Sequence, residues 1–175
     1  MKILLKILAY IAVMLLLIIF FSPKINLYYQ LEVLMQENNI YISDEKVKDS
    51  GFSLNINNAK LYLDELFLAN AEETSVKTWL VYNSIEAKNI ELNEGFAEFM
   101  PEHIDTMKVS YHILNPRNIL LNAQSEDSFF FGNVDLLERV VQIHLRLGTL
   151  SEKKFAMALK QLKKEEGGYI YEYKF

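Results

Sequence analysis

Residues 107–113 read MKVSYHI and carry the clearest strand signal in the chain. Apolar and polar residues alternate at every position, as they do in a strand that buries one face and exposes the other. Asn115-Pro116 ends the run, because proline lacks a backbone donor and steers the residue before it into extended geometry. The apolar set is Met107, Val109, Tyr111 and Ile113, and the polar set is Lys108, Ser110 and His112.

The same period of two recurs on both sides of this stretch. Short alternating runs fill residues 40–68 and return at 119–123 and 129–131, and residues 169–175 place an aromatic ring at every second position. The connections are too short for helical crossovers, so neighbouring strands should pair antiparallel. The sequence therefore predicts a mainly β fold of the α+β class: one mostly antiparallel sheet of roughly eight to ten strands that ends in an edge strand.

Residues 76–92 are rich in β-branched and aromatic residues, but their alternation is imperfect. The phase slips between Ala87 and Ile90, which predicts a bulge or a short turn near Lys88-Asn89. The run Trp79-Leu80-Val81-Tyr82 also hints at a strand that is apolar on both faces, as a groove would require.

Residues 138–147 fit either a strand or a helix. Apolar and polar residues alternate from Val141 to Leu147, whereas Leu137, Val141 and Leu145 would also line one side of a helix. Strict alternation and β-branching favour the strand.

Short helices are expected before the sheet and near its end. Ser22-Pro23 is typical of a helix start, with serine as the cap, and an amphipathic linking helix should follow over residues 23–38. This helix would pack on the sheet, or lie on the membrane surface with Tyr28 and Tyr29 among the headgroups. Ser151 should cap a late helix that ends at Gly167-Gly168.

Residues 3–21 read ILLKILAYIAVMLLLIIFF, with Lys6 as the single charge. At about 1.5 Å per residue this segment comes close to spanning a hydrocarbon core of about 30 Å. A cleaved secretory signal would have a shorter apolar region and small residues at its cleavage site, whereas bulky residues run here into Ser22-Pro23-Lys24. We therefore expect an uncleaved anchor over residues 1–22, the linking helix over 23–38 and a β-rich domain over 39–175.

Basic residues near the anchor set its orientation, because lysine and arginine are retained on the cytoplasmic side. Lys2 and Lys6 lie at its start, and after Lys24 the next basic residue is Lys46. We expect an inner-membrane protein with its N-terminus in the cytoplasm and its main domain in the periplasm of a bacterial-type envelope. The opposite orientation, with the domain in the cytosol, is the alternative.

Charge and residue types exclude several function classes. The chain carries a net charge of −5 and all of its Asp and Glu residues lie after residue 22, so the main domain would repel a phosphate backbone and nucleic acid is not an expected partner. The absence of cysteine excludes disulfides, thiolate catalysis and cysteine-ligated zinc.

We expect no enzyme activity, no metal and no cofactor. His103, His112 and His144 form no HxH or HExxH motif, and the latter two fall on the polar faces of their strands. Pairs of adjacent carboxylates are more typical of solvated turns and helix ends than of acid–base sites. The pairs are Asp64-Glu65, Glu72-Glu73 and Glu165-Glu166.

Two features predict binding surfaces instead. The rings of the last strand, Tyr169, Tyr171, Tyr173 and Phe175, mark a candidate edge that could pair with a partner's sheet. Aromatic residues make up 13% of the chain, enough either to fill a core or to line an apolar groove for acyl chains.

The anchor, residues 23–32 (PKINLYYQLE) and residues 54–61 (LNINNAKL) resemble the type II secretion system protein N family and, more distantly, AsmA-like envelope proteins. Residues 132–136 (GNVDL), with the basic residue and alternating strand that follow, are similar to the later strands of those families. The resemblance implies a single-pass inner-membrane protein whose periplasmic β-domain serves an envelope-spanning secretion machine.

Two function hypotheses follow. The first is a structural or assembly component of an envelope-spanning complex, either type II secretion-like or a flagellar-motor scaffold, because the chain combines an anchor and a sheet without a catalytic motif. Its partners would be other envelope-complex proteins and, through residues 3–21, the lipid bilayer. The alternative, suggested by the AsmA-like resemblance, is a lipid-handling module that binds acyl chains in a β-groove.

Overall fold

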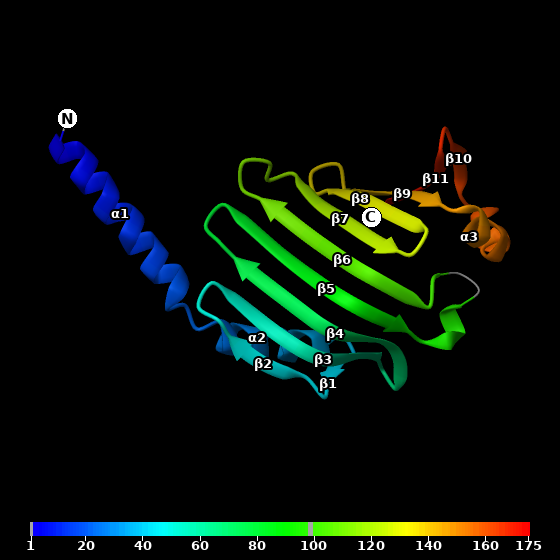
Figure 1. The fold of residues 1–175 in the computed structure, drawn as a ribbon, viewed down its shortest axis with the longest axis horizontal. Coiled ribbons are helices and arrows are strands. Elements are labelled where there is room, and N and C mark those ends of the chain that lie inside the picture. The colour runs from blue at the N-terminus through cyan, green and yellow to red at the C-terminus, as the bar shows by residue number, and fades with distance from the viewer. Residues whose placement is uncertain (1, 98–99) are drawn as a thin grey trace.

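A computed structural model of the protein describes residues 2–97 and 100–175. An N-terminal helix projects from a broad sheet, a second helix lies against the sheet, and short helices lie at the opposite end (Figure 1). The helices are α1 (Lys2–Phe20), α2 (Lys24–Gln36), a 3-10 turn (Glu94–Phe96), α3 (Thr149–Lys154) and α4 (Ala156–Leu159). The strands are β1 (Ile40–Ser43), β2 (Lys46–Asp49), β3 (Ser53–Leu63), β4 (Leu66–Thr78), β5 (Tyr82–Leu92), β6 (His103–His112), β7 (Asn118–Ser125), β8 (Ser128–Asp135), β9 (Val140–Leu147), β10 (Lys163–Glu165) and β11 (Gly168–Lys174).

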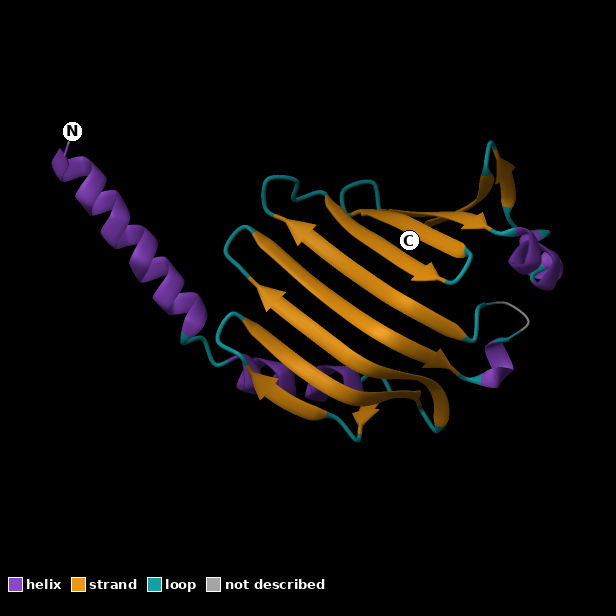
Figure 2. Ribbon diagram, in the orientation of Figure 1, coloured by secondary structure: helices purple, strands orange, loops and turns teal. Residues whose placement is uncertain are grey.

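All strands belong to one antiparallel sheet, in the order β1-β3-β4-β5-β6-β7-β8-β9-β11-β10, with β2 beside β1 on the outer side of β3 (Figure 2). The predicted mainly β, antiparallel fold is confirmed, as are the N-terminal apolar helix, the late helix and the terminal edge strand. The sheet has 11 strands rather than the expected eight to ten. The short strands β2 (KVKD) and β10 (KKE) are too charged to show an alternating pattern.

The ambiguous segment before the late helix is a strand. Val140–Leu147 forms β9, which pairs with β8 on one side and with β11 on the other. Strict alternation therefore predicted this element correctly.

The predicted irregularity in β5 lies at Asn89, whose φ is +49°. Asn58 in β3 also has a positive φ, +57°. The side-chain amide of Asn89 donates a hydrogen bond to the Glu72 carboxylate of β4 at 2.6 Å. Asparagine tolerates this left-handed conformation better than most residues do. The kink keeps the register, because Glu73 pairs with Lys88 before it and Ala71 with Ile90 after it.

The kinks change which residues face α2. Leu54 and Ile56 pack with Tyr28 of α2, and Ala59, three residues after Ile56, packs against the same cluster. In a regular strand residues three apart would face opposite ways. The left-handed residue at Asn58 therefore brings the second half of β3 back onto the α2 side.

The late helix differs from the expectation. It breaks at Phe155, whose φ of −97° and ψ of 15° leave helical geometry while its ring is buried, and α4 ends at Leu159. The following residues form β10 and turn through Glu166 and Gly167, with φ +90° at the glycine, into β11. Gly167 thus lies in a hairpin turn and Gly168 begins β11, so the pair does not terminate a helix.

Lys24 joins α1 to the sheet. Its side chain is 4% exposed, and Nζ donates to the Ile19 carbonyl at 2.8 Å and lies 3.7 Å from a carboxylate oxygen of Asp49. The carbonyls in the last turn of a helix have no partner within the helix, so a buried ammonium satisfies one of them. The predicted Ser22 cap is wrong: its hydroxyl donates to the Ile19 carbonyl, and α2 begins after Pro23 without a side-chain cap.

We expect Lys24→Met to loosen this junction, because methionine keeps the apolar stem but cannot donate to the Ile19 carbonyl. The chain has no cysteine, so cysteines placed at Lys2 and Lys88 would carry the only spin labels. The distance distribution between them should broaden in Lys24→Met. Lys60→Met is the control, because it removes an exposed ion pair with Asp44. Equal widths in the two variants would contradict a role for Lys24 in fixing the helix.

We also expect Asn89→Val to destabilise the sheet by about 1–2 kcal/mol, because a side chain branched at Cβ is strained at positive φ. Asn89→Gly should be close to neutral. Urea unfolding of the full chain in detergent, followed by circular dichroism, measures the change. Glu91→Val, in the same strand but beyond the kink, is the matched control. If both valine variants unfold at the same urea concentration, the left-handed conformation is not required.

Candidate functional site

The pairing register shows which side chains share a face of the sheet. Residues directly opposite one another on neighbouring strands point to the same side. Following these partners from β3 to β11 traces one central row of apolar residues. It consists of Leu54, Val76, Ile85, Val109, Leu121, Gly132, Ile143 and Tyr171.

The rows on either side of the central row also lack charged residues. One consists of Ala87, Met107, Ala123, Phe130, Leu145 and Tyr169, and the other of Asn83, Tyr111, Ile119, Val134, Val141 and Tyr173. We call the part of these rows that lies between β5 and β11 the apolar face. The strands β6, β7, β9 and β11 each place their predicted apolar set on this one side, and β5 and β8 add Ile85, Ala87, Phe130 and Val134, so the face is continuous from β5 to β11.

Helices cover only the margins of the apolar face. α2 packs over the β2–β4 side through Tyr28, which is 7% exposed. At the end far from α1, Glu152 of α3 accepts a hydrogen bond from the Tyr169 hydroxyl at 2.6 Å, and Lys154 pairs with Glu102. Between these helices the apolar residues are half-buried or exposed, with Ile85 at 47% and Tyr173 at 53%.

The uncovered area is large for a small protein. Strands lie about 4.8 Å apart and alternate residues about 7 Å apart, so the three rows across the six strands from β5 to β11 span roughly 24 by 14 Å, an area of about 340 Å². Apolar patches of this size on soluble monomers commonly mark sites for a ligand, a membrane or another protein. The apolar face is therefore the candidate functional site.

A cavity of about 190 Å³ opens between α2 and the edge of the apolar face. Its walls include Leu27 and Leu31 of α2 and Ile85 of β5, all largely exposed. Tyr28 also lines the cavity, where burial and the nearby Glu45 carboxylate raise the pKa of its phenol above the usual range. The phenol stays neutral at physiological pH, so α2 extends the face with uncharged side chains.

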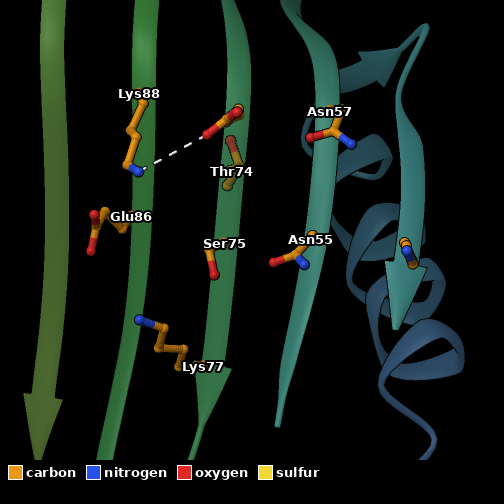
Figure 3. Close-up of a pocket in the computed structure, with 9 residues that line it drawn as sticks. Asn55, Asn57, Thr74, Ser75, Lys77, Glu86 and Lys88 are labelled. Atoms are coloured by element: carbon orange, nitrogen blue, oxygen red, sulfur yellow. Dashed lines mark ion pairs between the residues drawn. The ribbon is translucent and has the colours of Figure 1, made fainter. Parts of the chain in front are cut away.

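The opposite face of the sheet is polar. A shallow groove of about 450 Å³ crosses β2–β5, and Asn55, Ser75 and Lys77 point into it on the side of the sheet away from α2 (Figure 3). Charges alternate there: Lys88 lies 4.0 Å from Glu73, and Lys108, on the next strand, lies 3.6 Å from Glu86. Such a face is stable in water without a partner.

Phe129-Phe130-Phe131 is divided between the two faces. Phe130 lies in the apolar face, whereas Phe131 on the polar side stacks on His144 with ring centroids 4.6 Å apart, and Arg146 lies over the Phe131 ring. His144 also lies 3.1 Å from Glu165. The prediction that His144 lies on the polar face is confirmed.

The other histidines and the carboxylate pairs are dispersed. His103 pairs with Asp105 at 3.3 Å, and His112 lies beside the Tyr82 ring. Asp64-Glu65 and Glu165-Glu166 lie at exposed hairpin turns, whereas Glu72 bonds to Asn89 and Glu73 pairs with Lys88 within the sheet. Within residues 2–97 and 100–175 no group of three or more metal-ligating side chains is close enough to hold an ion.

The predicted terminal edge is partly covered. β10 pairs with Gly168–Ile170, so Tyr169 has a strand on each side, and its hydrogen bond to Glu152 raises the pKa of its hydroxyl. Residues 171–174 pair only with β9 among the described residues, and this leaves their outer backbone edge open. Phe175 follows, its N–H bonded to the Arg139 carbonyl and its ring exposed.

Sequence reasoning missed the apolar face as a site, because each strand taken alone suggests a core. One sequence signal could have indicated this site: the sequence predicts many alternating strands but too few helices to cover the apolar side of the sheet that they form. The expected groove segment within residues 76–92 is wrong at Trp79–Val81, which form the loop between β4 and β5.

No protein-family model, curated protein or solved structure matches the chain. The features that bear on function are the apolar face of the sheet and α1, which is long and apolar enough to cross a membrane.

Proposed function

We propose that this protein is a membrane-anchored lipid-handling module whose apolar face shields acyl chains. In this proposal α1 crosses the inner membrane with its N-terminus in the cytoplasm, and the sheet domain lies in the periplasm. The observation that carries the proposal is the apolar face, which spans the sheet from β5 to β11 and is covered only at its margins.

The chemistry of this face suits an acyl chain. Its rows contain no charged residue, and hydrocarbon requires apolar area without matched donors or acceptors. Covering about 340 Å² of apolar surface is worth on the order of 8 kcal/mol at about 25 cal/mol per Å². An occupant that removes this area from water therefore gains a large driving force.

The position of the face relative to α1 also supports lipid as the occupant. α1 ends against the turn before β3, where the Phe20 and Phe52 rings lie 5.3 Å apart. A sheet held this close to a bilayer-spanning helix meets lipid at a far higher local concentration than any soluble ligand. The anchor and residues 54–61 resemble AsmA-like envelope proteins in sequence, and this resemblance agrees with a lipid-handling role.

We expect Leu121→Glu to abolish the retention of phospholipid by the purified full chain, because it places a carboxylate in the centre of the apolar face. Leu120→Glu is the matched control: the same residue type on the same strand, 47% exposed, but on the polar side. Native mass spectrometry after exchange into mild detergent counts the bound lipid.

Wild-type protein and Leu120→Glu should both carry lipid, and Leu121→Glu should not. Lipid-free wild-type protein, or equal loss in both variants, would contradict the proposal. Circular dichroism of each variant checks that the sheet is intact.

A second candidate function rests on a different observation, the open backbone edge of residues 171–174. Unpaired donors and acceptors on an edge strand can recruit a strand from another protein. In this proposal the chain is an assembly component of an envelope-spanning machine, type II secretion-like or a flagellar-motor scaffold, with other envelope proteins as partners.

A photoreactive residue at Tyr173 should crosslink in cells to one discrete protein, because this position lies on the open edge. The same residue at Tyr169, which β10 covers, should give no such product. Mass spectrometry of the product identifies the partner. Lipid adducts alone at Tyr173 would support the first function over the second.

A further inference from the structure

The hairpin loops at the α1 end of the sheet are apolar. The antiparallel order brings the turn before β3 and the β4–β5, β6–β7 and β8–β9 loops to this end, where α1 also ends (Figure 1). The loops present Phe52, Trp79–Val81, Ile113-Leu114 and Leu136-Leu137. All are exposed, with Leu114 at 84% and Leu137 at 63%. We call these residues the apolar rim.

Three tight turns at the other end of the same strands are acidic. The β3–β4 turn is Asp64-Glu65, the β7–β8 turn is Glu126-Asp127, and the β10–β11 turn contains Glu166. Tight turns favour small and polar residues, so these acidic turns are ordinary and the apolar ones are not. An exposed leucine or tryptophan at a loop tip gains nothing in water. The clustering of bulky apolar tips at one end of the sheet points to an apolar environment there.

The rim is continuous with the membrane-spanning helix. The Phe20 ring at the end of α1 packs edge-on against Phe52, and Phe52 stacks on Trp79 with centroids 5.5 Å apart. Aromatic side chains, tryptophan above all, concentrate at the boundary between acyl chains and headgroups. The aromatic contact thus runs from the last turn of α1 directly into the β4–β5 loop.

The charge of the rim loops suits a bilayer surface. The basic residues within the rim loops are Arg117 and Arg139, beside a single acidic residue, Glu138. Anionic lipid headgroups attract basic side chains and repel acidic ones. The rim loops therefore carry no excess of acidic residues that would repel anionic headgroups.

We propose that the apolar rim inserts into the headgroup layer of the bilayer that α1 spans, so that the sheet stands on the membrane with its strand ends in lipid. The partner is the bilayer itself, and the contact is separate from whatever occupies the apolar face. A variant whose apolar face no longer binds lipid should keep the contact between rim and bilayer. A variant that loses the rim contact should still bind lipid at the apolar face.

Fluorescence quenching tests the insertion, because Trp79 is the only tryptophan in the chain. In two variants Trp79 is replaced by phenylalanine and a new tryptophan is placed at Leu114 or at Leu137. Its fluorescence then reports whether a loop away from the end of α1 contacts lipid. Trp79→Phe with Met157→Trp is the matched control, because Met157 is 79% exposed on α4 at the other end of the sheet. Each full chain is reconstituted in nanodiscs of phosphatidylethanolamine and phosphatidylglycerol, with or without bromine on the upper part of the acyl chains.

We expect brominated lipid to quench both rim tryptophans and to shift their emission to shorter wavelength, while the tryptophan at position 157 keeps its intensity and responds to aqueous acrylamide instead. Rim tryptophans that behave like the one at position 157 would overturn the proposal. Quenching at all three positions would overturn it as well, because the domain would then lie flat on the bilayer. A lipid-retention assay on the same variants reports separately on the apolar face.

Discussion

From β3 to β9 each strand pairs antiparallel with the strand that follows it in the sequence, and this ladder carries the alternation of every strand into its neighbour. A slip of one residue at any pairing would move the next strand's apolar set to the other side. No such slip occurs between β5 and β9, where the partners stay in one register. Even the kink at Asn89 preserves the pairing on both sides.

The result is a sheet of one layer with two unlike faces. Most domains bury the apolar side of a sheet under helices or under a second sheet. Here α2 buries only the region around Leu54 and Ile56, and α3 and α4 lie at the far end. The polar side is satisfied by ion pairs such as Lys108–Glu86, so it needs no cover. Only the apolar side still has to be shielded from water, and the proposed function is assigned to that side.

Local pattern predicted the strands well because alternation is a property of a few consecutive residues. Residues 107–113, 140–147 and 169–175 were recognisable for this reason, and the phase slip located the kink at Asn89 to within a residue. The failures depend on contacts that the local sequence does not contain. Ser22 bonds back to α1 because Lys24 and Phe20 fix the junction, and Lys163–Glu165 form a strand because Gly168–Ile170 offer a pairing edge.

The candidate site was harder to predict than the fold. The central row joins Ile85, Leu121 and Tyr171, which are far apart in sequence, and only the register brings them together. Trp79–Val81 looked like part of a strand because a loop of bulky apolar residues has the composition of one. Residue type alone does not distinguish an apolar loop tip that contacts lipid from an apolar strand that packs in a core.

The meander has a further consequence for how the molecule forms. Because each long strand pairs with its predecessor, a newly made strand always finds its partner already in place, and no segment waits for a distant one. Contacts between neighbours in sequence lower the entropy cost of closing loops and favour fast folding. α2 precedes β3 and supplies the surface on which the first hairpin settles. The sheet can therefore grow by one hairpin at a time from the anchored side, in the order in which the ribosome delivers the chain.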